Sequence, residues 1–281
     1  MPRIVSFLPA GSEIVHALGA GDQLVGRSHE CDFPAQVKDL PVVSRPALDL
    51  GGMSQAEIDQ AVATQLKSGE SLYLVDEELL RALDPDVILT QDLCQVCAPS
   101  GNELSRAITT LPSRPDVLYL TPRTLAEIDE NILAVGRAIG RESEAEALVA
   151  RNHARLETVR RATASRPKRR VVFLEWTDPF FCAGHWVPEM VEIAGGEDPF
   201  GRAGGDSVRI ELEDVRAFAP EIVVVAPCGF GLEDAARLAR ELPPIPGAAI
   251  RPVDANAFFA RPGPRYAEGV EVLAELFGER A

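Results

Sequence analysis

The chain has 281 residues, of which 46% are hydrophobic and 25% charged, a composition typical of a globular protein with a substantial core. Its net charge of -15 excludes nucleic-acid binding through a basic surface, because that mode of binding needs clustered Lys and Arg to neutralise phosphates. The apolar segment at residues 4–8 is too short for a signal peptide or a membrane span. We therefore expect a cytoplasmic protein with no membrane insertion.

The first part of the chain alternates short β-branched runs with amphipathic helical stretches, which is typical of an α/β protein with a largely parallel sheet. Ser54 and Glu57 form a capping box that predicts a helix start, and Gly69 is placed to end that helix. In chain order, we expect strands at 4–8, 23–25, 87–90 and 116–120, and helices at 12–18, 54–69 and 77–83.

The middle of the chain is mainly helical. A capping box of Thr124 and Glu127 predicts a helix that Gly140 interrupts. A second capping box at Ser143 restarts helix, which continues without Gly or Pro to about residue 164. With a rise of about 1.5 Å per residue, this second helix is long enough, at roughly 30 Å, to connect two lobes.

The alternation of strand and helix resumes after the basic segment 166–170. We expect strands at 171–174 and 222–225, and helices at 187–194, 211–218, 232–242 and 266–277. The segments 78–86 and 213–221 echo each other, because each ends a helix with Pro and an acid directly before a strand. This internal repeat predicts two similar lobes. The predicted parts are an N-terminal lobe at 1–122, a helical linker at 123–166 and a C-terminal lobe at 167–281.

Six segments spread over nearly the whole chain resemble one protein family. They are 2–13 (PRIVSFLPAGSE), 83–89 (LDPDVIL), 181–184 (FCAG), 189–196 (EMVEIAGG), 220–225 (PEIVVV) and 259–265 (FARPGPR). Their order and spacing are similar to those of the ABC-transporter substrate-binding proteins of class III, which serve cobalamin and siderophore uptake, and the cobalamin-binding branch is the nearest likeness. The resemblance implies two Rossmann-like α/β lobes with largely parallel sheets, joined by one long rigid helix, and a ligand held between them.

The same resemblance implies a membrane partner. Family members carry one glutamate on each lobe that docks on arginines of an ABC permease, and Glu78 and Glu213 occupy the matching positions. Acidic residues at a helix start are also favoured by the helix dipole alone. Both explanations of the two glutamates stay open at this point.

The aromatic residues leave the identity of the ligand open. Cobalamin-binding relatives enclose the corrin with aromatic side chains, and Phe181 stands at one such position, but Thr90 and Ser207 stand where that branch has indoles. A flat macrocycle loses apolar contact without those rings. The aromatic residues available to compensate are Trp176, Phe180, Trp186, Phe230, Phe258 and Phe259.

Ligands of doubly wound sheets bind at the loops that leave the carboxyl ends of the strands. We assign the polar and aromatic segments 28–32, 91–97, 175–178, 182–186 and 227–230 to such loops. A further Pro-rich loop offers two arginines, which either clamp a carboxylate or phosphate of the ligand or pair with acidic neighbours. The predicted ligand-binding residues are His29, Asp92, Glu175, Trp176, Phe181, His185, Trp186, Phe230, Arg261 and Arg265.

All five cysteines are expected in these loops and in reduced form. Thiolates and imidazoles are ligands of zinc, copper(I) and iron, so a protein-bound metal or iron–sulfur centre is one hypothesis. The spacing of Cys94 and Cys97 also fits a redox dithiol, and buried cysteines often act as small apolar residues. A further alternative is that His29 or His185 ligates or hydrogen-bonds a metal carried by the ligand, such as the cobalt of a corrinoid. The candidate metal ligands are Cys31, Cys94, Cys97, Cys182 and Cys228.

The sequence contains no Walker loop, dinucleotide fingerprint or nucleophile elbow. We therefore expect no enzyme, but a binding protein that captures cobalamin, another corrinoid or a related metal chelate. The alternative is a cytoplasmic metalloprotein or enzyme that holds a metal or iron–sulfur centre in a Cys- and His-rich cleft. A third hypothesis is an interaction protein with a degenerate cleft.

Overall fold

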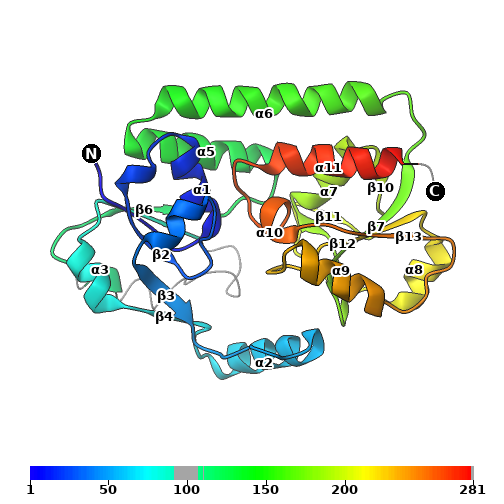
Figure 1. Cartoon of the computed structure of the whole chain (residues 1–281), viewed down its shortest axis with the longest axis horizontal. Helices are drawn as coiled ribbons and strands as arrows, with labels where there is room; N and C mark the ends of the chain where they lie inside the picture. Colours follow the sequence, from blue (N-terminus) through cyan, green and yellow to red (C-terminus); the bar gives the residue numbers. More distant parts are fainter. Residues whose placement is uncertain (92–106, 110, 280–281) are drawn as a thin grey trace. The chain divides into compact units, whose positions relative to one another are not determined.

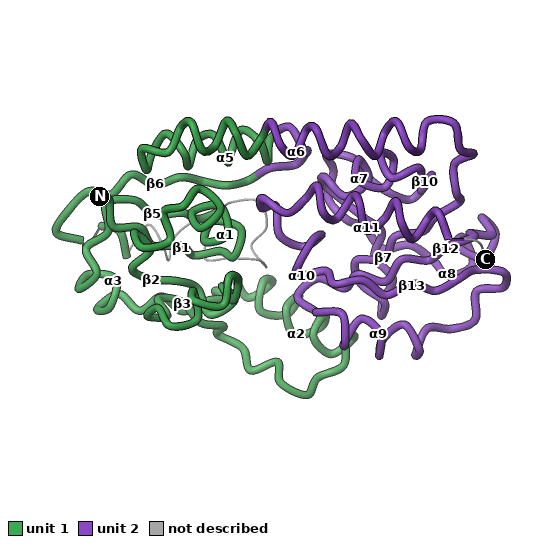
Figure 2. The backbone as a smooth tube through the Cα atoms, turned by 45° about the horizontal axis from the view of Figure 1, so that its top comes forward, with its two compact units in different colours: residues 1–121, 127–149 green, residues 122–126, 150–281 purple. Residues whose placement is uncertain are grey.

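The structure, a computed structural model, describes residues 1–91, 107–109 and 111–279. The chain divides into two compact units (Figure 2): unit 1 comprises residues 1–121 and 127–149, and unit 2 comprises residues 122–126 and 150–281. Each unit contains a mainly parallel sheet with helices, so the predicted α/β class is confirmed. The domain boundaries at 122 and 166 stay predictions.

Unit 1 is built on a six-stranded sheet in the order β4-β3-β2-β1-β5-β6. All neighbouring strands are parallel except β3 and β4. The strands are β1 (Ile4–Ser6), β2 (Leu24–Ser28), β3 (Val42–Pro46), β4 (Tyr73–Val75), β5 (Val87–Thr90) and β6 (Asp116–Tyr119). The helices described in unit 1 include α1 (Pro9–Ala17), η1 (Gly21–Gln23), η2 (Ala35–Asp39), α2 (Gln55–Ser68), α3 (Glu77–Leu83) and, from residue 127 on, α5 (Leu125–Ile139). The core residues that they bury together include Val5, Phe7, Val43, Leu80, Ile88 and Ala107.

Helix α2 starts and ends at the residues that the sequence predicts. The Ser54 hydroxyl accepts a hydrogen bond from the backbone N–H of Glu57 (3.3 Å), and the Glu57 carboxylate accepts one from the N–H of Ser54 (2.8 Å). Gly69 ends the helix with φ 73°, a left-handed conformation that glycine adopts without steric cost. The predicted capping box is therefore confirmed.

Unit 2 is built on a sheet in the order β10-β7-β12-β13, and β8 pairs antiparallel with β7. Strands β9 and β11 form a separate two-stranded sheet. The strands are β7 (Arg169–Thr177), β8 (Phe180–Cys182), β9 (Gly184–His185), β10 (Gly196–Glu197), β11 (Arg202–Ala203), β12 (Ile222–Val225) and β13 (Ala249–Pro252). The helices of unit 2 are α7 (Val187–Ile193), α8 (Leu212–Phe218), α9 (Leu232–Glu241), α10 (Ala255–Phe258) and α11 (Tyr266–Gly278).

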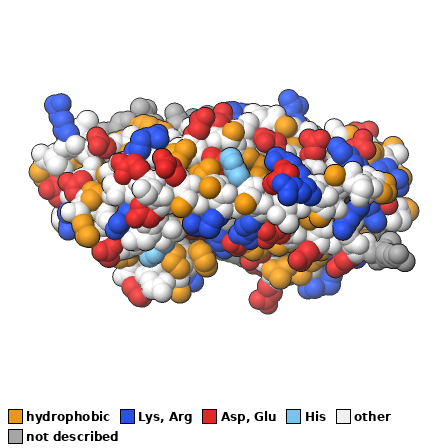
Figure 3. Space-filling view, turned by 90° about the horizontal axis from the view of Figure 1, so that it is seen from above, with side chains coloured by type: hydrophobic (Ala, Val, Ile, Leu, Met, Phe, Trp, Pro, Cys, Tyr) orange, Lys and Arg blue, Asp and Glu red, His pale blue; other side chains and the backbone are white. Residues whose placement is uncertain are grey.

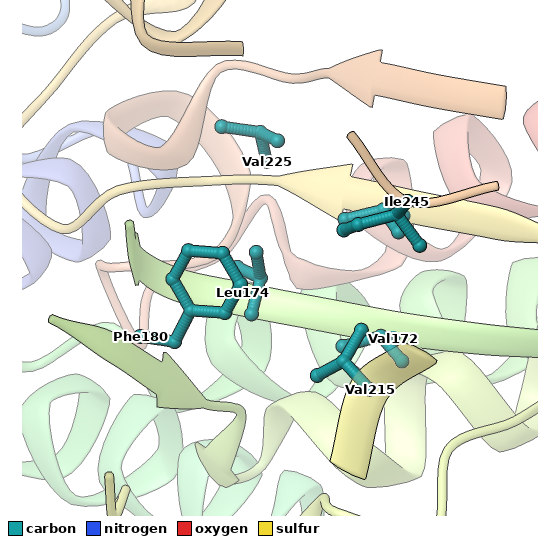
Figure 4. Close-up of a cluster of buried hydrophobic side chains, with 7 residues drawn as sticks. Val172, Leu174, Phe180, Val215, Val225 and Ile245 are labelled. Atoms are coloured by element: carbon teal, nitrogen blue, oxygen red, sulfur yellow. The ribbon is translucent and has the colours of Figure 1, made fainter. Parts of the chain in front are cut away.

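The core of unit 2 follows from the alternation of side chains along its strands. Val172 and Leu174 of β7 point to one face of the sheet, where they pack with Val215 of α8 and with Ile245 (Figure 4). Phe173, between them in the sequence, packs on the opposite face, where its ring lies 5.3 Å from that of Phe259. Because both faces are covered, the central segments, residues 171–174 of β7 and Ile222–Val225 of β12, are apolar.

Helix α6 (Glu142–Thr163) is one uninterrupted helix of 22 residues (Figure 1). Its residues 142–149 belong to unit 1 and its residues 150–163 to unit 2. Within unit 2, Arg155 pairs with both carboxylate oxygens of Glu271 (2.8 and 2.6 Å). The predicted capping box at Ser143 is wrong, because the first helical bond runs from Ala145 N–H to Arg141 O (3.0 Å) and leaves Ser143 inside the first turn.

The similar sequence segments 78–86 and 213–221 have the same local structure in the two units. In unit 1, Asp86 accepts a hydrogen bond from the backbone N–H of Arg3 (2.7 Å), and Arg3 Nε donates to the end of α3. In unit 2, Glu221 accepts from the N–H of Arg170 (3.0 Å), and Arg170 Nε donates to the end of α8. Both helices end in a residue with positive φ directly before the proline, Asp84 and Ala219. The internal repeat is thus a repeated helix-to-strand connection.

Charged side chains of both signs are interspersed over the face shown in Figure 3. On that face the negative net charge is not gathered into one acidic patch. Across the part of the chain that the structure describes, no helix combines the length and the apolar character that a bilayer span requires.

Candidate functional site

A β-hairpin at the carboxyl end of β7 corrects two predictions. Glu175, Trp176 and Thr177, expected in a loop, lie in β7, and Cys182, also expected in a loop, ends β8. The reason is that β8 folds back on β7 and extends its ladder, pairing Trp176 with Phe181. The aromatic side chains of these two residues are therefore cross-strand neighbours.

Three aromatic side chains and one guanidinium group gather around this hairpin. The rings of Trp176 and Phe230 meet edge to face, with centroids 5.7 Å apart. The guanidinium carbon of Arg209 lies 5.7 Å from the centroid of the Phe181 ring. Phe230 comes from the loop after β12, the neighbour of β7 in the sheet. The arrangement offers a ligand apolar ring surface and a cation side by side.

The Glu175 carboxylate holds the hairpin and a neighbouring turn together. One oxygen accepts a hydrogen bond from the backbone N–H of Gly184 (2.9 Å), and the other accepts one from the Ser207 hydroxyl. Burial raises the pKa of Glu175, and the two hydrogen bonds oppose that rise. Its backbone oxygen accepts from the N–H of Cys228 (3.0 Å). Both carboxylate oxygens have protein donors. Glu175 therefore holds these segments in place and has a structural role in the site.

We expect the Glu175→Gln variant to be as stable as the wild type at neutral pH, whereas Glu175→Ala loses stability. The glutamine oxygen still accepts from Gly184, and its amide donates to the Ser207 hydroxyl, which rotates to accept. Alanine leaves both donors without a partner, at a cost of about 1–3 kcal/mol. Urea unfolding of the two variants measures the difference, and equal losses in both would contradict the assigned hydrogen bonds.

His185 is held by the turn at residues 202–207. Its backbone has φ 51°, and it exchanges two hydrogen bonds with the turn, to Gly205 O (2.7 Å) and from Gly204 N–H (2.9 Å). Its Nε2 lies 3.2 Å from the Asp206 carboxylate, which also accepts from Arg123 Nη1 (3.1 Å). Burial lowers the pKa of His185, and this effect is partly offset by Asp206. Burial therefore favours the neutral form of the imidazole.

Three further predicted ligand-binding residues of unit 2 make other contacts, and one of them, Trp186, packs on His185 with ring centroids 5.7 Å apart. Trp186 is only 5% exposed, and its indole N–H donates to Phe259 O (3.1 Å), so it packs in the interior. The Arg265 guanidinium lies 5.7 Å from the centroid of the Phe258 ring, and Arg261 is half-buried in the same Pro-rich loop. Their role in ligand binding stays a prediction.

His29 lies in unit 1, directly after β2. Its Nδ1 is 3.1 Å from Ser44 O, its Nε2 is 3.8 Å from Glu30, and its ring centroid is 6.0 Å from that of Tyr73. Asp92, another predicted ligand-binding residue, lies outside the described residues. The carboxyl-end position expected for His29 agrees with the structure, and its contact with ligand stays a prediction.

The hypothesis of a cysteine-held metal centre finds no support in the described part of the chain. Cys31 is buried in unit 1, Cys182 is buried in unit 2 and Cys228 is exposed. Burial raises the pKa of the Cys182 thiol, which favours the protonated form over a metal-binding thiolate. Among the described residues, no three His, Cys, Asp or Glu side chains are grouped to hold a metal. Cys94 and Cys97 lie outside the described residues.

The structure places five of the predicted ligand-binding residues close together. Four further residues around this group were not predicted from the sequence. Glu175, Trp176, Phe181, His185 and Phe230 all lie around the ends of β7 and β12. The signal available in the sequence was the polar pair Asp206 and Ser207, which directly follows the glycine-rich stretch 201–205. The missed residues are Arg123, Asp206, Arg209 and the hydrogen-bonding role of Ser207.

The fold and the site together define a class of protein: an α/β binding protein of two units, in which polar and aromatic side chains line the carboxyl ends of parallel strands. The family model of the periplasmic binding proteins matches residues 4–242. The chain belongs to this family, whose members are substrate-binding proteins of ABC transporters and not enzymes.

Known relatives cover almost the whole chain. The vitamin B12-binding protein of Vibrio vulnificus (strain CMCP6) is 25% identical over 98% of this chain and 89% of its own length. The solved structure of the periplasmic vitamin B12-binding protein BtuF of Vibrio cholerae is 21% identical, with a TM-score of 0.68 over 99% of this chain and 98% of that chain. The periplasmic heme-binding protein RhuT from Roseiflexus sp. RS-1 is 23% identical, with a TM-score of 0.69 over 98% and 97% of the two chains. The resemblance seen in the sequence is confirmed.

Proposed function

We propose that the protein captures a corrinoid of the cobalamin type and delivers it to an ABC permease. The observation that carries the proposal is the group formed by Trp176, Phe181, Phe230 and Arg209 at the strand ends of unit 2. Membership of a family of transporter binding proteins, with a relative that binds vitamin B12, supports the same conclusion.

The chemistry of this group fits a large, flat, partly apolar ligand. Aromatic side chains bury wide apolar surfaces with little loss of conformational entropy. The Arg209 cation over Phe181 supplies donors for the amide or phosphate groups at the rim of a corrinoid. A cation and aromatic rings in one place also favour planar macrocycles over small hydrophilic solutes.

We expect the purified protein to bind cyanocobalamin at one site per chain, with a Kd of about 1 µM or tighter. Calorimetry measures the affinity, and the visible spectrum of the corrinoid reports its change of environment. Trp176→Ala should weaken binding, because it removes the ring that contacts Phe230. The matched control is Phe218→Leu, which removes one ring of the edge-to-face pair of Phe200 and Phe218 at the end of α8. Absence of binding to cobalamin and to every metal chelate tried would overturn the proposed function.

Haem is the second candidate ligand. The similarity to a solved heme-binding protein favours it, and a macrocycle with aromatic contacts suits the same rings. A titration with haemin separates the candidates, because a shifted Soret band together with unchanged cobalamin spectra assigns haem. A third titration uses a ferric chelate without a macrocycle and tests whether the protein binds any metal chelate.

Glu78 and Glu213 are the proposed contacts with the permease. Both are exposed and lie in the first turn of a helix of the repeated connection, α3 and α8. Glu213 is 78% exposed even though Arg216 lies 3.7 Å away, so its carboxylate is accessible to a partner. A Glu78→Gln, Glu213→Gln double variant should bind ligand normally but fail to stimulate a reconstituted permease.

The cellular compartment is a proposal that cell fractionation tests. A cytoplasmic location stays a prediction, and the relatives BtuF and RhuT are periplasmic. A role in delivery to a permease requires the protein on the side of the membrane from which the ligand enters. A cytoplasmic location would make it a carrier or salvage protein for the same ligand.

A further inference from the structure

One charged residue of unit 2 comes from a segment flanked in sequence by unit 1. Residues 122–126 belong to unit 2, while residues 1–121 and 127–149 belong to unit 1. Arg123 sits in this crossover segment, between β6 and α5. Any interaction that Arg123 makes with the ligand loops of unit 2 therefore acts on the connection between the units.

Arg123 makes such an interaction with the turn at residues 202–207. Its Nη1 donates to Asp206 Oδ1 (3.1 Å) and lies 3.3 Å from Gly204 O. The same oxygen of Asp206 lies 3.2 Å from His185 Nε2. The guanidinium and the imidazole thus share one acceptor, so a displacement of either changes the hydrogen bond of the other.

The turn itself is tied to the candidate site at three further points. His185 exchanges two backbone hydrogen bonds with it, β11 pairs with β9, and the Ser207 hydroxyl donates to Glu175. The His185 side chain is 18% exposed, whereas that of Asp206 is 71% exposed. His185 is therefore held in place by its neighbours and still accessible, while Asp206 is open to solvent.

We propose that Arg123 is a positioning residue, which through Asp206 fixes the His185 imidazole and the 202–207 turn for ligand binding and so couples ligand occupancy to the crossover segment. This inference rests on the proposed function for its ligand. Its geometry rests only on contacts within unit 2.

If Arg123 served only to stabilise the fold, its removal would lower the free energy of unfolding and leave the His185 titration unchanged. Solvent-accessible ion pairs contribute little to global stability, and the side chains of Arg123 and Asp206 are 44% and 71% exposed. Loss of the pair should therefore leave the free energy of unfolding nearly unchanged while the turn loses order.

The charges that act on His185 are those of Asp206 and Arg123, and its ring packs on Trp186. Removal of Arg123 should raise the pKa of His185 and removal of the Asp206 charge should lower it, because the two carry opposite charges.

The experiment compares wild type, Arg123→Gln, Asp206→Asn and the control Arg237→Gln. Arg237 pairs with Asp234 and Glu241 on α9, so its variant loses the same charge and a similar surface ion pair elsewhere in unit 2. The readouts are the His185 titration followed by NMR, amide exchange at 122–126 and 202–207 with and without cyanocobalamin or haemin, and ligand affinity.

We expect Arg123→Gln to weaken ligand binding roughly five- to tenfold and to abolish the ligand-dependent protection of residues 122–126. The His185 pKa should move in opposite directions in Arg123→Gln and Asp206→Asn, and Arg237→Gln should match the wild type. Unchanged affinity together with an unmoved His185 titration would overturn the inference. If the wild type binds no ligand, the proposed function fails, and the titration and the exchange of residues 202–207 still decide whether Arg123 positions His185.

Discussion

Gly184→Ala should both destabilise the protein and weaken its ligand binding, because a methyl group has no room at this position. A Cβ there would lie 2.6 Å from Ser207 N and 2.9 Å from Gly205 O, which are backbone atoms of the turn. The turn must therefore move away from β9. Because the N–H of Gly184 and the hydroxyl of Ser207 both donate to Glu175, that movement also breaks the hydrogen bonds of a buried carboxylate.

The expected cost is about 1–3 kcal/mol of unfolding free energy for forcing an extra methyl into a packed site. Ligand affinity should fall about tenfold or more, because the turn carries the contacts that hold His185. Gly205→Ala is the matched control, since the atoms nearest to a Cβ there belong to Arg202 and lie at 3.5 Å or beyond, which is ordinary van der Waals contact. Urea unfolding and ligand titration check both, and wild-type behaviour of Gly184→Ala would refute the assigned packing of the turn.

Much of the fold was predictable because its signals are local. The expected limits of α3, β5 and β12 agree with the structure, and α2 has the predicted capping residues. In each case a cap, a proline or an uninterrupted β-branched run marks the boundary within a few residues of sequence. The long helix α6 was predictable for the same reason, since no Gly or Pro interrupts it.

The short strands were not predictable, because partners far away in the sequence define them. Strand β10 is two residues long and exists through its pairing with Arg169 and Arg170. Strands β9 and β11 pair only with each other. Strand β8 was not expected, because its antiparallel return on β7 follows the segment 175–178, which was expected to be a ligand loop.

The candidate site was predictable as a set of loops and not as a set of contacts. Parallel strands bring their carboxyl ends to one edge, and this rule placed the loops after β7 and β12 together. Which side chains face the interior depends on packing that the sequence does not encode locally, as Trp186 and Cys182 illustrate. The pair of Arg123 and Asp206 joins residues that are 83 positions apart, so no local pattern marks it.

Asp198 provides a strong expected pH effect on the stability of unit 2. Asp198 directly follows strand β10, which ends at Glu197. One oxygen of its carboxylate accepts a hydrogen bond from the backbone N–H of Phe173 in β7 (3.0 Å), and the other accepts one from the backbone N–H of Phe200 (3.0 Å). Burial raises the pKa of Asp198 to about 6, against the opposing effect of these hydrogen bonds. The folded state therefore binds a proton more tightly than the unfolded chain does.

The sign of the effect follows from this difference. Between pH 7 and pH 4 the folded protein takes up a proton at Asp198 that the unfolded chain takes up only at lower pH, so wild type gains stability from this group as the pH falls. Two pKa units correspond to an upper limit of about 3 kcal/mol. Other carboxylates also titrate in this range, so the quantity to measure is the difference in unfolding free energy between wild type and Asp198→Asn.

That difference should shift in favour of wild type by up to about 3 kcal/mol as the pH falls from 7 to 4. Glu197→Gln is the control, because it removes a neighbouring exposed carboxylate and should show no comparable shift. Chemical unfolding at several pH values measures both. A difference that is independent of pH, or that shifts towards Asp198→Asn, would mean that the carboxylate is stabilised by its backbone donors more than it is penalised by burial, and that its pKa in the folded protein is not raised.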